Sequence, residues 1–318
     1  MATSGTFTFN QTRNEIIKDA LIKLNVVDIE EDSIASNYQS TAERALNRLL
    51  KSWQTKYVGL WTVKEATLFL ELSENRYSLG STGDHATKSY LRTQVATAAV
   101  SGASAVIVDS TSGMTAADNV GVQLDDGTLQ WFTIASKAGT TINLSGGTLN
   151  DDVAVDNYVY TYTTKITRPL RILSMRRMDV DYNETPLQAL NHVEYYELPR
   201  KTDTGFATMY FYDKQLDNGQ LNIWPATNDV TEVLKFTFQE PIMDIDAATQ
   251  NAELPSEWLD ALVFNLALML VPDFNAYAIL EKLVPFAQQT LTDAQNFDTE
   301  DASICISPST QGIVRGYR

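Results

Sequence analysis

Two histidines, His85 and His192, are the first candidates for chemistry, because an imidazole can act as a general base. A catalytic histidine needs a partner such as serine or aspartate that holds it in place, and neither lies in a sequence signature that supplies one. We therefore expect His85 in a loop and His192 near a helix turn. The single cysteine, Cys305, excludes an intrachain disulfide and fits synthesis in a reducing cytoplasm.

Carboxylates could bind calcium in a stretch of the chain rich in Thr, Ser and Gly. The candidates are Asp125, Asp126, Asp151, Asp152 and Asp156. Calcium takes oxygen ligands, but the spacing of these residues does not match an EF-hand loop. Aspartate is also one of the residues that turns favour. We therefore expect turn residues here and predict no metal site.

A pair of glutamates, Glu194 and Glu197, could hydrolyse glycosides, which needs two carboxyl groups about 5–10 Å apart across a cleft. Because the chain has 40 acidic residues, chance pairs are common, and a solvated face is the simpler interpretation. The sequence contains no P-loop, dinucleotide-binding fingerprint, HExxH motif, nucleophile elbow or paired CxxC motif. We therefore predict no catalytic residues and no cofactor.

The densest basic cluster consists of Arg168, Arg171, Arg176 and Arg177. Guanidinium groups bind carboxylates and phosphates through paired hydrogen bonds. The cluster could therefore bind an anionic ligand or an acidic neighbouring subunit, or it could balance carboxylates of its own chain. The second of these interpretations makes the four arginines candidates for a subunit interface.

The end of the chain supplies a further set of candidate binding residues: Ile313, Arg315, Tyr317 and Arg318. Tyrosine and arginine are over-represented among residues that anchor protein interfaces. Residues 298–318 are polar and cannot bury enough apolar surface alone, so we expect an extended arm. A frayed terminus is the alternative.

Composition limits the classes of partner. The 318 residues include 44% hydrophobic residues, which is enough for a substantial core, and carry a formal net charge of −16. This charge argues against a surface that grips nucleic acid, although DNA could pass nearby without adhering. No signal peptide is visible, and the longest apolar run, 261–271, is shorter than the about 20 residues that span a membrane.

Helical patterns occupy the two ends of the chain. Thr12 and Glu15 have the spacing of a capping box and precede the apolar helix face formed by Ile16, Ile17, Ala20, Leu21 and Leu24. A second helix should begin near Ser36 and end by Gly59, which would complete an αα-hairpin. Two more helices are expected from near residue 256 to 272 and from about 275 to 297, the latter kinked at Pro285.

The middle of the chain has the pattern of short strands. Residues 81–164 contain many Val, Ile, Trp, Phe and Tyr side chains that a linker lacks, so this block should form a small β-barrel or sandwich. Hairpin signals occur at Asp126–Gly127 and Gly146–Gly147 within the block and at Asn218–Gly219 after it.

Together these patterns predict an α+β protein with four parts: a helical body, an antiparallel β region, an inserted β-barrel or sandwich and an extended C-terminal arm. The helical body comprises the N-terminal αα-hairpin and the two C-terminal helices. The predicted domains are a core formed by residues 1–80 and 165–297, the inserted domain at 81–164 and the arm at 298–318.

The chain resembles the tail accessory factors of short-tailed bacteriophages, also called head-to-tail adaptors or head completion proteins. The phrases that carry the resemblance are TRNEIIKDALIKLNVV, AERALNRLLKSWQTK before LWT, RPLRILSMRR, HVEYYELPRKTDTGFATMYFYD, NGQLNIWPA and LPSEWLDALVFNLALMLVPDF. They occur in the family's order and cover residues 12–60 and 165 to about 290. The block at 81–164 resembles a β domain that only some members carry.

The resemblance implies a structural virion protein at the portal vertex, made in the host cytoplasm. It would form a homo-oligomeric ring, typically of twelve copies, beneath the portal protein. Such a ring extends the DNA channel, retains the packaged DNA and supports the tail nozzle and the fibres or spikes. Double-stranded DNA would pass through without sequence-specific binding, no membrane is implied, and the arm at 298–318 would reach along the portal.

Two other functions remain open from the sequence. A virion-associated peptidoglycan hydrolase would need a cleft with two carboxyl groups, one of them with a raised pKa. A carbohydrate- or receptor-binding module in the inserted block would need exposed aromatic rings, so it predicts that Tyr90 and Trp131 face solvent.

Overall fold

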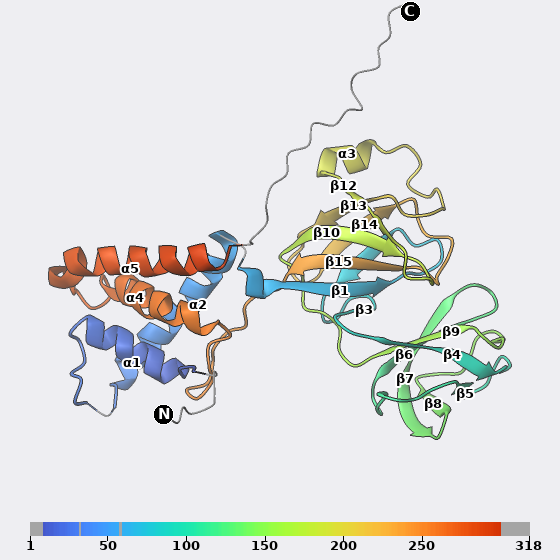
Figure 1. Cartoon of the computed structure of the whole chain (residues 1–318), viewed down its shortest axis with the longest axis horizontal. Helices are drawn as coiled ribbons and strands as arrows, with labels where there is room; N and C mark the ends of the chain where they lie inside the picture. Colours follow the sequence, from blue (N-terminus) through green and yellow to red (C-terminus); the bar gives the residue numbers. More distant parts are fainter. Residues whose placement is uncertain (1–8, 32, 57–58, 300–318) are drawn as a thin grey trace, which may run out of the picture. The chain divides into compact units, whose positions relative to one another are not determined.

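The computed structural model describes residues 9–31, 33–56 and 59–299, and these form a mixed α+β protein (Figure 1). The described residues divide into two compact units, one from 1–60 with 244–318 and the other from 61–243. The first is helical, and the second is β-rich. The residues expected to form one core, 1–80 and 165–297, are therefore shared between the two units.

The helical unit is built around one apolar helix. Its elements are α1 (Arg13–Lys23), α2 (Ser36–Lys56), the 3₁₀ turn η2 (Ser256–Trp258), α4 (Leu259–Leu270) and α5 (Tyr277–Phe297). Helix α4 contacts α1, α2 and α5 (Figure 1). A helix surrounded in this way must be apolar on most of its surface, which explains why Asp260 and Asn265 are the only polar residues from Leu259 to Leu270.

The local signals at α1 are confirmed. The Thr12 hydroxyl accepts a hydrogen bond from the Glu15 N–H, and the Glu15 carboxylate accepts one from the Thr12 N–H at 2.7 Å, which completes a capping box. All five residues predicted to share the apolar face are buried. Helix α5 continues through Pro285 and buries few side chains, including Leu283 and Ala287.

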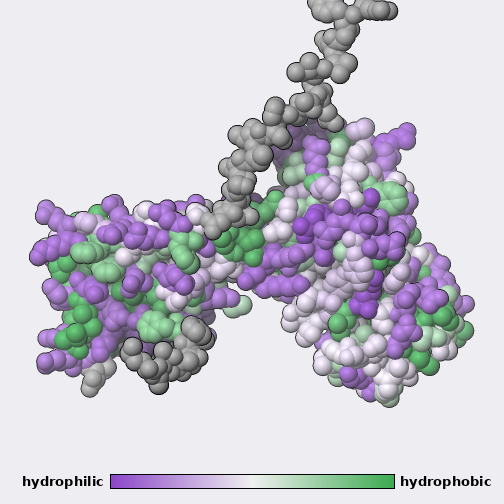
Figure 2. Space-filling model, viewed as in Figure 1, coloured by the Kyte–Doolittle hydropathy of each residue, from purple (hydrophilic) through white to green (hydrophobic). Residues whose placement is uncertain are grey.

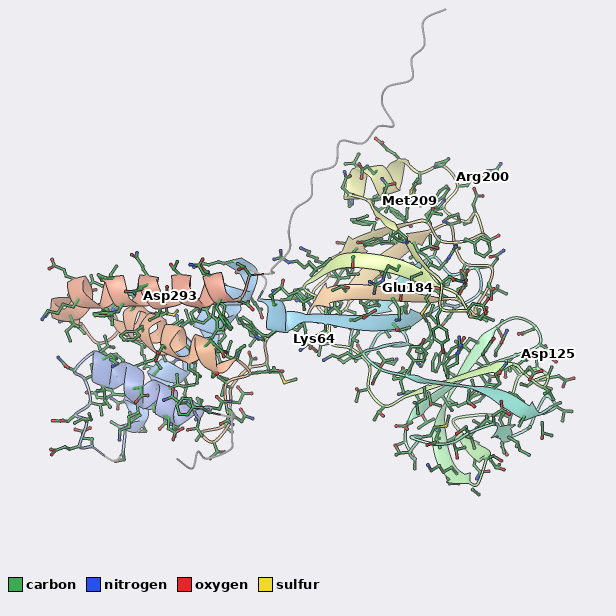
Figure 3. All side chains as sticks on the ribbon, viewed as in Figure 1. Lys64, Asp125, Glu184, Arg200, Met209 and Asp293 are labelled. Atoms are coloured by element: carbon green, nitrogen blue, oxygen red, sulfur yellow. The ribbon has the colours of Figure 1, made fainter. Side chains whose placement is uncertain are left out.

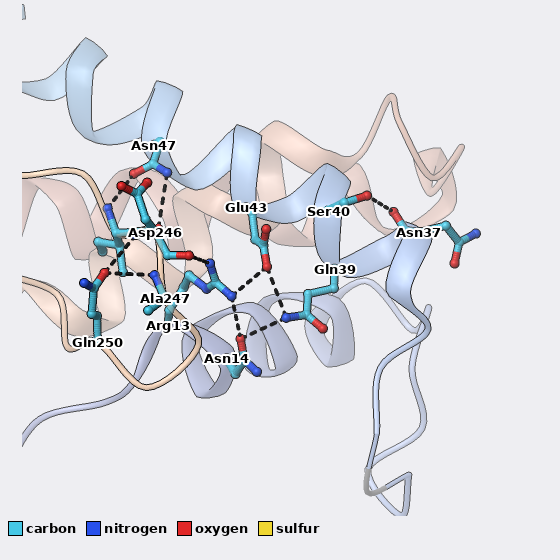
Figure 4. Close-up of polar contacts among 11 residues, drawn as sticks. Arg13, Asn14, Asn37, Gln39, Ser40, Glu43, Asn47, Asp246, Ala247 and Gln250 are labelled. Atoms are coloured by element: carbon cyan, nitrogen blue, oxygen red, sulfur yellow. Dashed lines mark hydrogen bonds and ion pairs between the residues drawn. The ribbon is translucent and has the colours of Figure 1, made fainter.

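A polar network joins α1 and α2 to the chain that precedes α4 (Figure 4). Arg13 is only 5% exposed; its guanidinium pairs with Glu43 at 2.7 Å and donates to the Asp246 carbonyl at 2.5 Å. The Asn47 amide exchanges two hydrogen bonds with the backbone of Ile245, at 3.0 and 3.4 Å. These bonds satisfy polar groups that packing of the helices removes from water.

The β-rich unit contains two sheets and a barrel. The five-stranded sheet has the order β11 (Glu184–Pro186), β10 (Arg171–Met178), β15 (Val233–Gln239), β1 (Val63–Phe69) and β3 (Ala86–Thr87). The four-stranded sheet has the order β12 (Gln188–Ala189), β13 (Met209–Asp213), β14 (Gly219–Trp224) and β2 (Arg76–Leu79). The 3₁₀ turn η1 (Leu60–Thr62) precedes β1, and α3 (His192–Glu197) lies between β12 and β13.

One core joins the two sheets into a sandwich, because side chains from both sheets belong to the same buried cluster. It includes Leu68 and Phe236 from the five-stranded sheet and Tyr77, Leu221 and Ile223 from the four-stranded sheet. The expected hairpin near Asn218–Gly219 exists, but its loop spans residues 214–218. Gly219 itself lies in β14, where a Cβ atom would sit 1.9 Å from the Tyr212 hydroxyl oxygen.

The inserted block forms a closed barrel, which is one of the two alternatives, barrel or sandwich, that the sequence left open. Its strands are β4 (Leu91–Thr97), β5 (Ala105–Val108), β6 (Asn119–Gln123), β7 (Leu129–Ala138), β8 (Thr141–Ser145) and β9 (Tyr158–Tyr162), joined in the order β4-β5-β8-β7-β6-β9. Valine, isoleucine, leucine, methionine and phenylalanine side chains fill the interior. Pairing of β4 with β9 closes the barrel and leaves neither of these strands as an edge.

One of the two hairpin signals in the block is correct. Asp126–Gly127 lies in the turn that joins β6 to β7, with Gly127 at φ 81°. The hairpin of β7 and β8 instead turns at Gly139–Thr140, with Gly139 at φ 60°. Gly146–Gly147 belongs to the longer connection from β8 to β9. A glycine allows a positive φ both at Gly139 and at Gly146. Composition alone therefore could not show which of the two lies in the turn between paired strands.

An aromatic cluster joins the barrel to the sandwich. Phe69 on β1 points away from the sandwich core and contacts rings of the barrel, including Trp131, Tyr160 and Tyr162, with centroid separations of 5.1 to 6.0 Å. The Trp131 indole lies over Gly121 on the neighbouring strand, where a Cβ atom would approach the ring to 2.9 Å. The outer surface of the barrel is therefore shaped for this contact.

Within the described ranges, the structure contains no helix that combines the length and the apolar character of a bilayer-spanning segment. Of the predicted arm, Asp298 and Thr299 are described, and 300–318 lie outside the described residues. The Asp298 carboxylate accepts a hydrogen bond from the Leu60 N–H at 2.9 Å.

Candidate interaction surface

Arg176 belongs to a charged network on the outer face of the five-stranded sheet, the face directed away from the sandwich core. Its guanidinium contacts Glu65 at 2.6 Å and Glu184 at 3.0 Å, and Lys235 contacts the same two carboxylates at 3.7 and 3.3 Å. Figure 2 shows a mainly hydrophilic surface over β10, β15 and β1. The network has two positive and two negative charges, so it balances itself.

The other predicted arginines also have contacts within the chain. Arg177 contacts Glu232 at 3.4 Å, and Arg168 donates to the Gln215 carbonyl at 3.1 Å. Arg171 is half-buried at the start of β10, opposite Gln239. Burial raises the pKa of Glu232, and the charge of Arg177 opposes that rise. A subunit-interface role for the four arginines stays a prediction, and Arg176 and Arg177 already pair with carboxylates of their own chain.

The stretch of chain from α3 to residue 206 carries a set of exposed or half-exposed side chains that the sequence did not single out. We call it the α3 patch and define it as Val193, Tyr196, Arg200, Lys201 and Phe206. Its three apolar members are 61%, 57% and 55% exposed, in the order Val193, Tyr196 and Phe206. Arg200 lies on the loop that follows α3 (Figure 3).

Local sequence positions this patch. The Asn191 side chain accepts from the Glu194 N–H at 3.0 Å, and the Glu194 carboxylate accepts from the Asn191 N–H at 2.8 Å. This capping box fixes the start of a helix of only six residues. Tyr195 is buried against Phe211, with ring centroids 5.6 Å apart, and therefore leaves Tyr196 and Val193 on the outside.

Cations lie over the aromatic rings of the α3 patch. The Lys201 ammonium is 5.5 Å from the ring centroids of both Tyr195 and Tyr196, and it donates to the Tyr196 carbonyl at 3.1 Å. The Arg177 guanidinium is 4.5 Å from the Phe206 ring centroid. Exposed tyrosine, phenylalanine and arginine side chains are enriched at protein interfaces, whereas lysine is depleted there. The patch is therefore the best-supported interaction surface of the β-rich unit.

The two glutamates proposed as a glycosidase pair lie on α3, and both are exposed. Glu194 serves the capping box described above, so its carboxylate already has a structural role. His192 is the first residue of the same helix, and its ring lies 4.4 Å from the Tyr196 ring. The expectation that His192 lies near a helix turn is confirmed.

His85 lies in a loop directly before β3, as predicted, and it belongs to the aromatic cluster. Its ring stacks on Trp131 with centroids 3.8 Å apart and planes 3° apart, and its Nδ1 is 2.6 Å from the Tyr162 hydroxyl oxygen. Burial, and secondly the charge of Lys165, lowers the pKa of His85 to about 3. The imidazole is therefore neutral at physiological pH and holds the barrel against the sandwich.

We expect this histidine to make the protein less stable in acid. The usual histidine pKa is about 6.5, and the folded value is about 3, so between these pH values the unfolded chain binds more protons. The free energy of unfolding should therefore fall as the pH drops through this window, by up to about 1.4 kcal/mol per pH unit. Urea unfolding at pH 7, 6, 5 and 4 measures the slope. His85→Asn should flatten it, and an unchanged slope would contradict this role.

The aromatic rings expected to face solvent do not do so. Tyr90 and Trp131 are both half-buried, and both pack against the cluster that joins the barrel to the sandwich. Phe69 contacts both, with ring centroids 5.3 and 5.1 Å away. The expectation was wrong because the outer face of a small barrel is also the face by which it contacts its host domain. A carbohydrate-binding function of the barrel loses this support.

The aspartates considered for calcium lie in the loops of the barrel, and the side chains of three of them accept hydrogen bonds there. Asp125 (Figure 3) accepts from the Ala154 N–H at 2.9 Å and the Asn157 amide at 2.8 Å, and Asp152 accepts from the Ser101 N–H at 2.7 Å. Asp126 accepts from Thr128 at 2.8 Å, and Asp156 adopts φ 71°. In the described part of the chain, no group of three acidic, histidine or cysteine residues is placed to hold a metal ion.

The candidate portal-binding residues Ile313, Arg315, Tyr317 and Arg318 lie outside the described residues. A scan against protein-family models gives no matching family, and a search of curated proteins gives no match.

The α3 patch was missed although a local signal for it exists. Asn191 and Glu194 have the same capping-box spacing that correctly located α1, and they mark Tyr195 and Tyr196 as neighbours on a short helix. The signal cannot say which tyrosine is buried. That choice depends on Phe211, which comes from β13.

Proposed function

We propose that this chain is a structural head-to-tail adaptor of a short-tailed bacteriophage virion. It forms a ring beneath the portal protein, extends the DNA channel and supports the tail nozzle and fibres. The observation that carries the proposal is the ordered resemblance over residues 12–60 and 165 to about 290. Its phrases coincide with regular elements of both units, among them α1, α2, β10, β14 and α4.

The charge of the chain supports this function. Each copy carries a formal net charge of −16. A ring of such copies presents a surface that repels the DNA backbone, so DNA moves through the channel without being held by it. The adaptor therefore needs no nucleic-acid-binding site.

The α3 patch supports an assembly function because it exposes one aliphatic and two aromatic side chains, Val193, Tyr196 and Phe206. We assign the patch to contacts between neighbouring subunits of the ring.

Removing the aromatic members of the patch should stop ring assembly without unfolding the chain. Tyr196→Ser and Phe206→Ser should each change the free energy of unfolding by less than about 1 kcal/mol, because both side chains are more than half exposed. Together they should abolish ring formation on portal particles, as seen by negative-stain electron microscopy. Val155→Ser removes an exposed apolar side chain from the barrel and should assemble normally. If the double variant formed normal rings, the α3 patch would not be part of the subunit interface.

Deleting residues 313–318 tests portal binding. We expect binding to isolated portal rings to weaken at least about tenfold, while the free energy of unfolding stays unchanged. Deletion of residues 2–7, which has the same length at the other terminus, is the control and should bind normally. Unchanged docking of the C-terminal deletion would contradict the portal-binding arm, and clearing of a peptidoglycan zymogram would contradict a purely structural function.

A further inference from the structure

A groove of about 410 Å³ lies between α1 and the start of α4 in the helical unit. We call it the α1–α4 groove. Its apolar lining includes Ile22 from α1 and Val263 and Phe264 from α4. Phe9 and Ile29 line it as well, and they are 71% and 74% exposed. Its volume lies in the range of about 300–1,000 Å³ that binding clefts occupy. Clustered exposed apolar side chains of this kind mark an interaction site.

The lining of the α1–α4 groove also contains a free carboxylate. Asp260 lies in the first turn of α4 and is exposed. Within the described part of the chain, its side chain takes part in no hydrogen bond or ion pair. Asp19, in the same lining, instead accepts from the Gln11 amide at 2.9 Å. The groove therefore favours an apolar occupant that brings a cation for Asp260.

The α3 patch has both of these properties. Val193 and Tyr196 are three residues apart on α3, so their exposed side chains share one face of this helix. Arg200 is exposed on the loop that follows (Figure 3). Among the described residues, its guanidinium has no hydrogen-bond or ion-pair partner. A helix with an apolar face is a common occupant of an apolar groove.

We propose that the α3 patch of one copy docks in the α1–α4 groove of a second copy, with Tyr196 in the groove and Arg200 paired with Asp260. The proposal rests on the ring proposed above and names the surface that the α3 patch meets there. A guanidinium and a carboxylate form paired hydrogen bonds, and covering the exposed apolar side chains removes their surface from water. Because the two surfaces differ, the contact is head-to-tail, and repeated head-to-tail contacts form a ring when the rotation closes.

Charge reversal tests the pair. Arg200→Asp and Asp260→Arg should each raise the protein concentration needed for ring formation on portal particles at least about tenfold, because each variant brings two like charges together. Both substitutions in one chain should restore rings. An equal mixture of the two single variants should also restore them when the copies alternate around a ring of even number. Negative-stain electron microscopy counts the rings.

Two more variants separate the groove from the rest of the helical unit. Ile29→Ser removes an exposed apolar side chain from the groove lining and should also raise the required concentration at least about tenfold. Asp293→Arg reverses an exposed carboxylate on α5 (Figure 3), which is not part of the groove lining, and should form rings as the unsubstituted chain does. Circular dichroism at 222 nm checks that every variant is folded.

The outcomes distinguish this inference from the proposed function. If the unsubstituted chain forms no rings on portal particles, the proposed function is wrong. If it forms rings, and Asp260→Arg and Ile29→Ser form them equally well, only the groove assignment is wrong. Loss of rings in both single charge variants without rescue by the mixture or by the doubly substituted chain would show that Arg200 and Asp260 are not partners. Loss of portal binding by individual Asp260→Arg copies would assign the groove to the portal instead.

Discussion

Replacing Arg13 with alanine should lower the free energy of unfolding of the helical unit by about 3 kcal/mol. Removing one partner of a buried ion pair leaves the remaining polar groups buried without a partner. The guanidinium joins α1 to Glu43 on α2 and to the Asp246 carbonyl before α4. Alanine leaves the carbonyl without this donor and Glu43 without its cation. Urea unfolding followed by circular dichroism at 222 nm measures the loss.

An exposed ion pair of the same helical unit, formed by a residue of α2, supplies the control. Lys51 on α2 contacts Asp244 at 2.7 Å, the same separation as in the Arg13 pair, but both side chains are largely exposed. Lys51→Ala should cost less than about 1 kcal/mol, because exposed pairs contribute little. If the two variants lost equal stability, burial would not be the reason that Arg13 matters.

Phe69→Ala should destabilise the β-rich unit by about 3–5 kcal/mol, the range for removing a buried aromatic side chain. Phe69 is 2% exposed and contacts four aromatic residues: Tyr90, Trp131, Tyr160 and Tyr162. Alanine leaves a cavity between the barrel and the sandwich. Neither can close it, since each has a rigid core of its own. Urea unfolding followed by tryptophan fluorescence reports the change.

Two further measurements distinguish loss of the contact from general unfolding. Phe69→Leu retains most of the buried area and should cost clearly less than the alanine variant. Limited proteolysis of Phe69→Ala should cut within residues 88–90 or 163–170, which connect the barrel to the sandwich, before it cuts either core. A loss below about 1 kcal/mol for Phe69→Ala would show that the cluster does not hold the barrel in place.

Local signals predicted most elements correctly because their causes act over a few residues. The capping box at Thr12 and the apolar spacing after it predicted both α1 and its buried face. Short strand-like runs rich in apolar side chains, with a turn at Asp126–Gly127, predicted a barrel or a sandwich, since this much apolar surface needs an interior. The same reasoning failed at Gly146–Gly147, because glycine permits a turn without specifying which strands pair afterwards.

Turns, helix caps and the buried faces of helices depend on neighbours within one helical turn or along one strand. The sequence alone therefore determined the mixed α+β class, the helices α1, α2, α4 and α5, a barrel or sandwich for the inserted block, and the loop positions of His85 and the aspartates. Only the tertiary structure decided which of these residues meet. His85 and Tyr162 are 77 residues apart and Arg13 and Asp246 are 233 apart, yet each pair is within hydrogen-bonding distance. Contacts of that kind depend on strand order and helix packing, which pack Trp131 against Phe69 and leave Tyr196 exposed.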